Sequence, residues 1–221
     1  AAKVRGSHVR YITVAHDTMW SRDYGPLVVE HADGSAAVVD GQYDLARTAD
    51  DLVPAEFARH LQLPLVQIDM RIDGGNLLSN GRGLCIATTE IVNVNSDRAL
   101  TEDAIAEGLR TCFGAKQTVF LEPLANETTG HVDMFATFTD AQTVVVGSIR
   151  PEDDAVNSAI LNRNAARLAG VQTARGPLRV VRIPMGPHGD GIWRTYTNVI
   201  YANGLMLVPV YPGVDDQGQL D

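Results

Sequence analysis

The sequence predicts an α/β fold in which one unit, a β-hairpin followed by a helix and a single strand, occurs nearly four times. Two observations carry this prediction. Paired apolar runs are separated by turn signals such as Asp33-Gly34, and helix-like stretches lie between successive pairs. Because tandem ββαβ units must stack in a line or close radially, we expect a propeller-like ring. A doubly wound parallel sheet is the alternative, although hairpin turns favour antiparallel pairs.

Four hairpins are expected in chain order. Their turns fall at residues 33–34, 80–83, 139–140 and 203–204. The apolar runs that pair around these turns cover residues 27–29 and 36–39, 77–78 and 84–87, 132–138 and 143–146, and 197–201 and 205–210.

Three helices are expected between the hairpins, over residues 50–61, 101–113 and 151–168. Each of them precedes a short apolar strand, at 65–70, 117–121 and 178–183. The second helix has the clearest ends, because Thr101 is a typical N-cap and Gly114 a typical C-terminal stop.

Composition argues against a membrane protein and against a nucleic-acid-binding protein. The chain has 221 residues, of which 45% are hydrophobic and 20% charged, and no apolar run approaches the roughly 18 residues of a membrane helix. We therefore expect one soluble domain over residues 1–221 that does not enter a membrane. The net charge of -9 disfavours nucleic acid as a partner and suits a cationic ligand.

Cysteine usage and the chain ends add two expectations. Cys85 and Cys112 are too few for a disulfide framework, and no signal-peptide pattern opens the chain, so a cytoplasmic location is expected. Both thiols look like small buried hydrophobic groups. The missing initiator methionine and the lack of a closing element before Asp221 suggest an incomplete domain, a piece of a longer protein.

Two clusters of polar residues come early in the chain. In the segment 16–26, Asp23 is either a turn cap or a carboxylate that accepts hydrogen bonds from a planar cation stacked on Trp20. Asp73 stands before Gly74 and Gly75, which permit a close approach of backbone or ligand, so it is either a simple turn residue or a group at the same site.

Two further clusters come later. Strand alternation from Val132 onward would place His131 and Asp133 on one face, as a general acid–base pair, part of a metal site or a surface histidine. Asn198 opens the last hairpin and is either an edge residue or a further polar group at the site. All four clusters precede a hairpin, and equivalent positions of a closed ring converge at one end of its axis. We therefore expect Asp23, His131, Asp133 and Asn198 to share one cleft.

A second His-x-Asp pair, His188 and Asp190, leaves two other functions open. One is a metal-dependent hydrolase that uses His131, Asp133, His188 and Asp190. The other is a non-catalytic module that binds guanidinium groups.

Four motifs in order, W-S-R-D-Y-G-P, D-G-G-N, T-G-H-V-D-M and Y-T-N-V-I-Y-A-N-G-L, resemble those of bacterial peptidylarginine deiminases and agmatine deiminases. The last motif continues as M-L-V-P-V-Y, so the four extend over residues 20–211. The resemblance implies a pentein fold, an α/β propeller of five ββαβ units around a pseudo-fivefold axis, of which this chain holds about four. Where agmatine deiminases usually carry Glu-Gly-Gly, this chain has Asp73-Gly74-Gly75.

The resemblance also implies roles and partners. It implies that Asp23 and Asp133 grip the guanidinium nitrogens, that His131 is the general acid–base, and that Trp20, Asn198 and Asp73 bind substrate. The implied reaction is hydrolytic deimination of agmatine or peptidyl-arginine by a cysteine nucleophile outside this chain, without metal or cofactor. A homodimer is the candidate assembly. This chain alone is expected to be inactive.

Overall fold

The computed structural model describes residues 11–202 and 204–211. The chain divides into two compact units, Ala1–Arg71 and Ile72–Asp221. The expectation of one domain over residues 1–221 stays a prediction. No helix in the described part of the chain is long and apolar enough to cross a bilayer.

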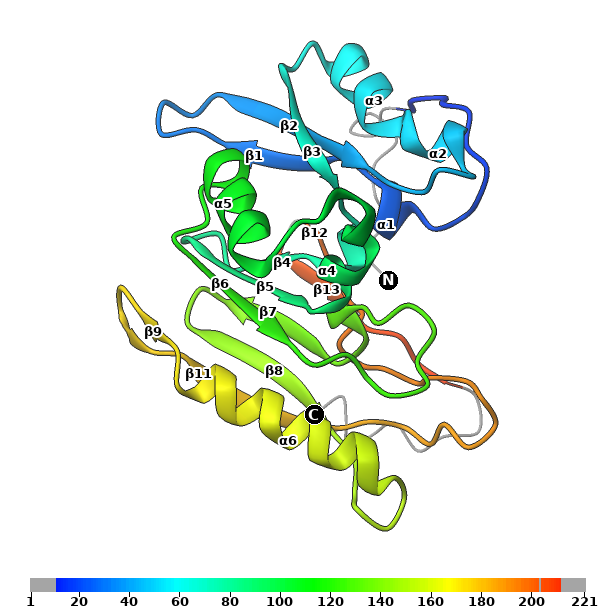
Figure 1. Cartoon of the computed structure of the whole chain (residues 1–221), viewed down its shortest axis with the longest axis vertical. Coiled ribbons are helices and arrows are strands. Elements are labelled where there is room, and N and C mark those ends of the chain that lie inside the picture. Colours follow the sequence, from blue (N-terminus) through cyan, green and yellow to red (C-terminus); the bar gives the residue numbers. More distant parts are fainter. Residues whose placement is uncertain (1–10, 203, 212–221) are drawn as a thin grey trace. The chain divides into compact units, whose positions relative to one another are not determined.

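The first unit is one three-stranded sheet with helices (Figure 1). Its elements are α1 (Ser21–Tyr24), β1 (Leu27–Glu30), β2 (Ala36–Gln42), α2 (Thr48–Asp51), α3 (Val53–Leu61) and β3 (Leu65–Arg71). Strand β1 pairs antiparallel with β2, and β2 pairs parallel with β3 after the helical crossover. The unit therefore has the expected order of hairpin, helix and strand.

The second unit repeats this plan twice and adds a last hairpin. Its strands are β4 (Leu78–Ser79), β5 (Leu84–Thr88), β6 (Gln117–Leu121), β7 (Ala136–Asp140), β8 (Thr143–Ser148), β9 (Gln172–Thr173), β10 (Gly176–Pro177), β11 (Arg179–Pro184), β12 (Ile200–Ala202) and β13 (Leu205–Leu207). Its α-helices are α4 (Glu90–Val94), α5 (Glu102–Phe113) and α6 (Ala155–Ala169), and its 3₁₀-helices are Gly74–Asn76, Ser96–Arg98 and Val132–Met134.

The sheet topology confirms the repeat. Sheets β4-β5-β6 and β11-β8-β7 each contain an antiparallel hairpin whose second strand pairs parallel with the strand that follows the helix. Strands β12 and β13 form the fourth hairpin. The antiparallel pairs exclude the purely parallel, doubly wound alternative. The small β9–β10 hairpin and α4 were not predicted.

Helix boundaries differ from the sequence pattern at two places. The helix expected over residues 50–61 is split into α2 and α3, because Pro54 lacks an amide hydrogen and its ring is tolerated only in a first turn. The helix expected from residue 151 begins at Ala155, because the side chain of Asp154 accepts a hydrogen bond from the backbone of Asn157 and caps the helix. Thr101 and Gly114 cap α5 as predicted.

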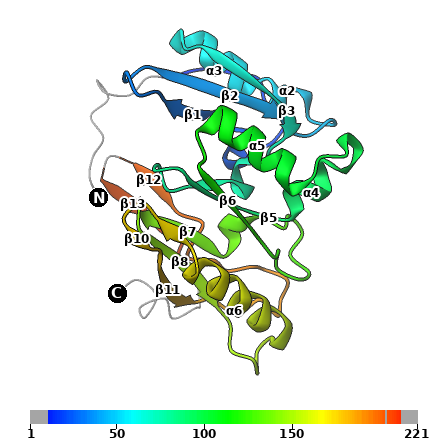
Figure 2. The same cartoon turned by 60° about the vertical axis from the view of Figure 1, so that its left-hand side comes forward.

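Helix α6 joins the sheets of the second unit into one core (Figure 2). Its fully buried Leu161 and Leu168 belong to the same apolar cluster as residues of β6 and β8. On the same helix, the buried amide of Asn164 bonds both the N–H and the C=O of Glu122. The amide of Asn157 does the same for Ala125. These bonds fix the segment that leads from β6 toward residue 131.

The Asp154 cap gives a prediction of stability and its pH dependence. Hydrogen bonds from the backbone and side chain of Asn157, together with one from His188, lower the pKa of Asp154 to about 2. We expect Asp154→Ala to lower the free energy of unfolding at pH 7 by about 1 to 2 kcal/mol, measured by urea denaturation. Because the native pKa lies below the unfolded value of about 4, the stabilisation present at higher pH is lost as the pH falls from about 4 through 2.

The neighbouring Asp153 provides the matched control. It is half exposed and pairs with Arg150 on the surface, so Asp153→Ala should cost well under about 1 kcal/mol. Equal losses in the two variants would show that Asp154 does not stabilise the fold as a cap.

Candidate functional site

Three segments that precede hairpins meet in the second unit. They are the 3₁₀-helix Gly74–Asn76 before β4, the 3₁₀-helix Val132–Met134 before β7, and residues 195–199 before β12. The two 3₁₀-helices contact each other. The hydroxyl of Thr197 donates to the backbone carbonyl of Asp133 over 3.0 Å, which ties the third segment to the second. Equivalent positions of three successive repeats therefore lie together.

The buried side chain of Asn76 holds the first two segments in place. Its Oδ1 accepts hydrogen bonds from the backbone amides of Thr88 (2.9 Å) and Val132 (3.2 Å), and lies 3.0 Å from the Thr88 hydroxyl. The Thr88 hydroxyl also lies 2.5 Å from the carbonyl oxygen of Gly130. The Asn76 amide oxygen and the Thr88 hydroxyl thus hold the residues that precede and follow His131.

The turn before His131 is fixed by a carboxylate. Glu127 accepts hydrogen bonds from the amide and hydroxyl of Thr129 and from the amide of Gly130 at 2.7 Å. Gly130 has a φ of 67°, and a Cβ there would lie 3.0 Å from the Glu90 side chain. The positive φ favours glycine here, and a larger residue would also have to displace the Glu90 side chain.

His131 and Asp73 form the central pair of the site. Nε2 of His131 lies 3.4 Å from Oδ2 of Asp73, and the histidine side chain is only 10% exposed. Asp73 begins the short helix that carries Asn76, so the same segment supplies the carboxylate and the anchor. An imidazole oriented by a carboxylate can take up and release a proton at neutral pH.

Asp133 is buried, with 3% of its surface exposed. The prediction that a strand would place His131 and Asp133 on one face is wrong, because Val132–Met134 is a 3₁₀-helix and β7 begins only at Ala136. The reason lies in the core: Val132 and Phe135 are both fully buried, and a spacing of three is the period of a 3₁₀-helix rather than of a strand. That spacing was visible in the sequence.

Asn198 lies half-buried between two buried neighbours, Thr197 and Val199. It is not part of a strand, since β12 begins at Ile200. The hydroxyl of Tyr211 accepts from the amide of Thr195 and donates to its carbonyl, which holds this segment at its start. Thr197 then links it to Asp133. The sequence pattern singled out Asn198 but not Thr197, whose hydrogen bond to Asp133 depends on the tertiary structure.

Trp20 and Asp23 belong to the first unit. Trp20 precedes α1 and is 53% exposed, and Asp23 lies within that helix. Their loop is anchored by Asp50, which accepts hydrogen bonds from the amides of Asp17 and Thr18 and from the Thr18 hydroxyl. Burial alone would raise the pKa of Asp50, but these hydrogen bonds outweigh it and lower the pKa. That Asp23 shares a cleft with His131 stays a prediction, as does the role of Trp20 in substrate binding.

The second His-x-Asp pair has other contacts. Nε2 of His188 lies 3.0 Å from Asp154, and its ring stacks on Trp193 with centroids 4.4 Å apart. Asp190 accepts two hydrogen bonds from Arg194 at 2.6 and 2.9 Å. Among residues 11–202 and 204–211, no three His, Cys, Asp or Glu side chains gather in a group that could hold a metal. The metal-hydrolase alternative therefore has no support from these side chains.

Neither thiol of the chain is an activated nucleophile. Cys85 lies inside β5, where burial raises the pKa of its thiol although a hydrogen bond with Ser79 partly offsets this. Burial also raises the pKa of Cys112 near the end of α5. A thiol that retains its proton is a poor nucleophile.

Comparison with known proteins identifies the family. The Porphyromonas-type peptidyl-arginine deiminase family matches residues 1–220. The chain belongs to this family. A curated relative from Shewanella sp. (strain MR-7), named "Putative agmatine deiminase", is 29% identical over 254 residues, which cover 98% of this chain and 68% of that protein.

Solved structures of the same kind share the fold. The crystal structure named for "the Putative Arginine Deiminase from Porphyromonas gingivalis" gives a TM-score of 0.80 at 26% identity, covering 95% of this chain and 67% of that one. Agmatine deiminase of Enterococcus faecalis gives 0.79 at 21% identity, covering 92% and 65%. The expected pentein fold is confirmed. This deiminase-family chain spans about two thirds of the length of these relatives.

The Asn76 anchor gives a prediction that can be tested in the chain itself. Asn76→Ala leaves the buried amides of Thr88 and Val132 without their acceptor, so it should lower the free energy of unfolding by about 2 to 4 kcal/mol. Urea denaturation measures this. Asn93→Ala, in an exposed position on α4, is the control and should change stability by less than about 0.5 kcal/mol. Similar small effects in both variants would contradict the anchoring role.

Proposed function

We propose that the protein containing this chain hydrolyses a guanidino group to a ureido group and ammonia, with His131 as general acid–base. The observation that carries the proposal is the His131–Asp73 pair beside buried Asp133, in a chain of the deiminase family. The substrate is agmatine or the arginine side chain of a peptide. Both present a planar cation that suits carboxylate partners.

In this proposal each residue has one task. Asp133 and Asp23 accept hydrogen bonds from the guanidinium nitrogens, Trp20 packs against the planar end of the substrate, and Asn198 binds beside it. Asp73 orients His131 through the 3.4 Å contact. Positioning is the main catalytic contribution, because a held cation stays in line for attack.

The proposed reaction has two halves, attack by a thiolate and hydrolysis by water. A thiolate attacks the guanidinium carbon, and His131 protonates one nitrogen as the carbon–nitrogen bond breaks and ammonia leaves. His131 then takes a proton from water, which attacks the thiouronium carbon. The carbon–sulfur bond breaks, and the ureido product and the thiolate are released. The raised pKa of Cys85 and of Cys112 favours a thiolate supplied by a cysteine outside these 221 residues.

The activity test is ammonia release by the full-length protein from agmatine and, separately, from an arginine-containing peptide. His131→Asn should lower kcat by about 100-fold or more, since a general acid–base typically contributes 10² to 10⁴. His60→Asn, at an exposed position of α3, is the matched control and should leave kcat unchanged. The substrate that yields ammonia with the higher kcat/KM identifies the substrate class.

Three outcomes would contradict the proposal. Full activity of the His131→Asn enzyme would remove the assigned acid–base. Loss of activity on treatment with a chelator, restored by a divalent metal, would favour the metal hydrolase. Guanidinium binding without ammonia release from either substrate would favour the non-catalytic module.

The 221-residue chain gives a separate prediction. It should release no ammonia from either substrate, because both of its thiols are held protonated by burial. Ureido product formed by this chain, and still formed after Cys85→Ala and Cys112→Ala, would show that the thiolate mechanism is wrong.

A further inference from the structure

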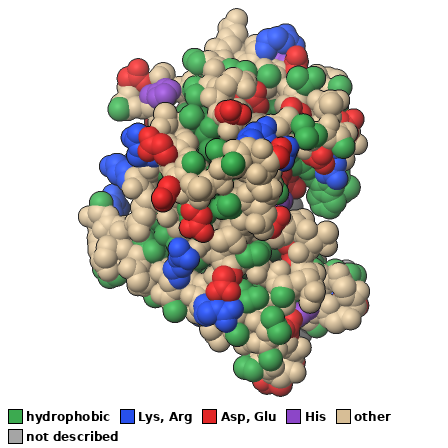
Figure 3. All heavy atoms as spheres, in the orientation of Figure 1, with side chains coloured by type: hydrophobic (Ala, Val, Ile, Leu, Met, Phe, Trp, Pro, Cys, Tyr) green, Lys and Arg blue, Asp and Glu red, His purple; other side chains and the backbone are tan. Residues whose placement is uncertain are grey.

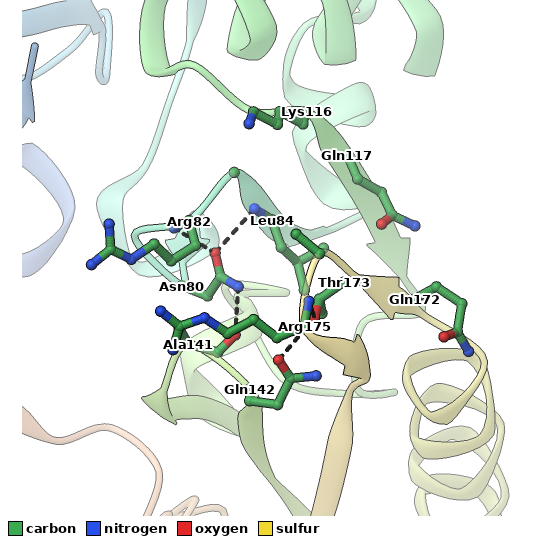
Figure 4. Close-up of a pocket in the computed structure, with 12 residues that line it drawn as sticks. Asn80, Arg82, Leu84, Lys116, Gln117, Ala141, Gln142, Gln172, Thr173 and Arg175 are labelled. Carbon is green, nitrogen blue, oxygen red and sulfur yellow. Dashed lines mark hydrogen bonds between the residues drawn. The ribbon is translucent and has the colours of Figure 1, made fainter. Parts of the chain in front are cut away.

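A hollow lies at the turn ends of the hairpins in the second unit (Figure 4). It has a volume of about 350 Å³. Its lining consists of Asn80 and of residues 82–84, 116–117, 141–142 and 172–175. We call it the turn pocket. Strand β7 runs from the His131 segment to this end over five residues, so about 17 Å of strand separate the two sites.

The frame of the turn pocket is fixed by two side-chain amides. Oδ1 of Asn80 accepts from the amides of Arg82 and Leu84, and its Nδ2 donates to the carbonyl of Ala141, 61 residues away. Gln142 donates to the carbonyls of Gly176 and Pro177 and accepts from the Thr173 hydroxyl. Three turns from separate hairpins are thereby joined, and the hollow is preformed.

All charged side chains that line the turn pocket are cationic: Arg82, Lys116 and Arg175. Figure 4 shows these three side chains extending to the same side of the pocket. The stem of Lys116 packs on Gly83, where a Cβ would lie 3.0 Å from its Cγ. The nearest acid along the chain, Asp140, accepts a hydrogen bond from the amide of Gln142 and does not line the hollow.

The three cations of the turn pocket differ from those arginines of the chain that pair with a carboxylate. These are Arg59, Arg110, Arg150, Arg163 and Arg194. Within the described residues, none of the three cations of the turn pocket forms an ion pair. Acidic and basic side chains are interspersed on the surface seen in Figure 3, and the chain carries a net charge of -9. Three cations without an ion-pair partner in the described part of the chain therefore surround one hollow.

We propose that the turn pocket binds a small multivalent anion of the phosphate class. Two guanidinium groups offer planar forks that match phosphate oxygens, and an ammonium group adds a third, compact charge. The volume lies at the lower end of the range for small-molecule sites, which suits inorganic pyrophosphate or a small phosphate ester. Because the side chains of Asn80 and Gln142 already fix the turns, the backbone of the turn pocket needs little reordering on binding.

Isothermal titration calorimetry at fixed salt tests the proposal on the purified chain. The probes are inorganic pyrophosphate, glycerol phosphate and, as a carboxylate comparison, citrate. Saturable binding of one pyrophosphate per chain is expected, weakened at least tenfold in the double variant Arg82→Gln/Arg175→Gln. Arg167→Gln removes an exposed cation of α6 outside the pocket and should leave the affinity unchanged.

The same titrations show whether the ligand is a phosphate ester or a free phosphate, and which results contradict the proposal. Tighter binding of glycerol phosphate than of pyrophosphate would identify an ester as the ligand type, and the reverse order would identify a free phosphate. No saturable binding of either, equal binding by wild type and the double variant, or binding of citrate alone would overturn the proposal. Thermal unfolding of each variant checks that the fold is retained, since the exchanged side chains lie at the surface of the hollow.

Discussion

The geometry of the candidate site depends on one buried amide oxygen. Oδ1 of Asn76 receives the backbone amides of Thr88 and Val132, which belong to successive repeats of the chain. A buried amide that lost this acceptor would pay its full desolvation cost, so the two repeats hold a single relative arrangement. Asp73 precedes the short helix that ends at Asn76, and His131 directly precedes Val132, so this bond joins the two segments whose side chains lie 3.4 Å apart.

Apolar burial supplies stability, while the polar groups supply position. The cluster around Leu161 and Val144 buries apolar side chains of the second unit, but it does not specify where a loop begins. That task falls to Asn157 and Asn164, which bind the backbone after β6, and to Glu127, which closes the turn before His131. Satisfied buried networks of this kind rigidify a site before any ligand arrives.

The two ends of the hairpins differ in charge. At the entry end, the carboxylate of Asp73 lies beside the His131 imidazole, and Asp133 is buried in the same segment as His131, an acidic environment that would suit a cation. At the turn end, Arg82, Lys116 and Arg175 surround a hollow without an acid. One repeated scaffold thus presents opposite charges at opposite ends of the same short strands. The length of a strand separates the acidic groups from the basic groups. The basic side chains at the surface therefore interact only weakly with the distant carboxylates, because salt screens exposed charges over about 10 Å.

The sequence by itself determined the repeating hairpin, helix and strand, since turn dipeptides and apolar runs act over a few residues. It located β6 at its observed bounds and the caps Thr101 and Gly114 of α5. Only the tertiary structure decided that Asn76 reaches Val132, 56 residues away. The physical reason is that buried hydrogen bonds and core packing join residues far apart in the chain, and no local propensity encodes which donor will meet which acceptor.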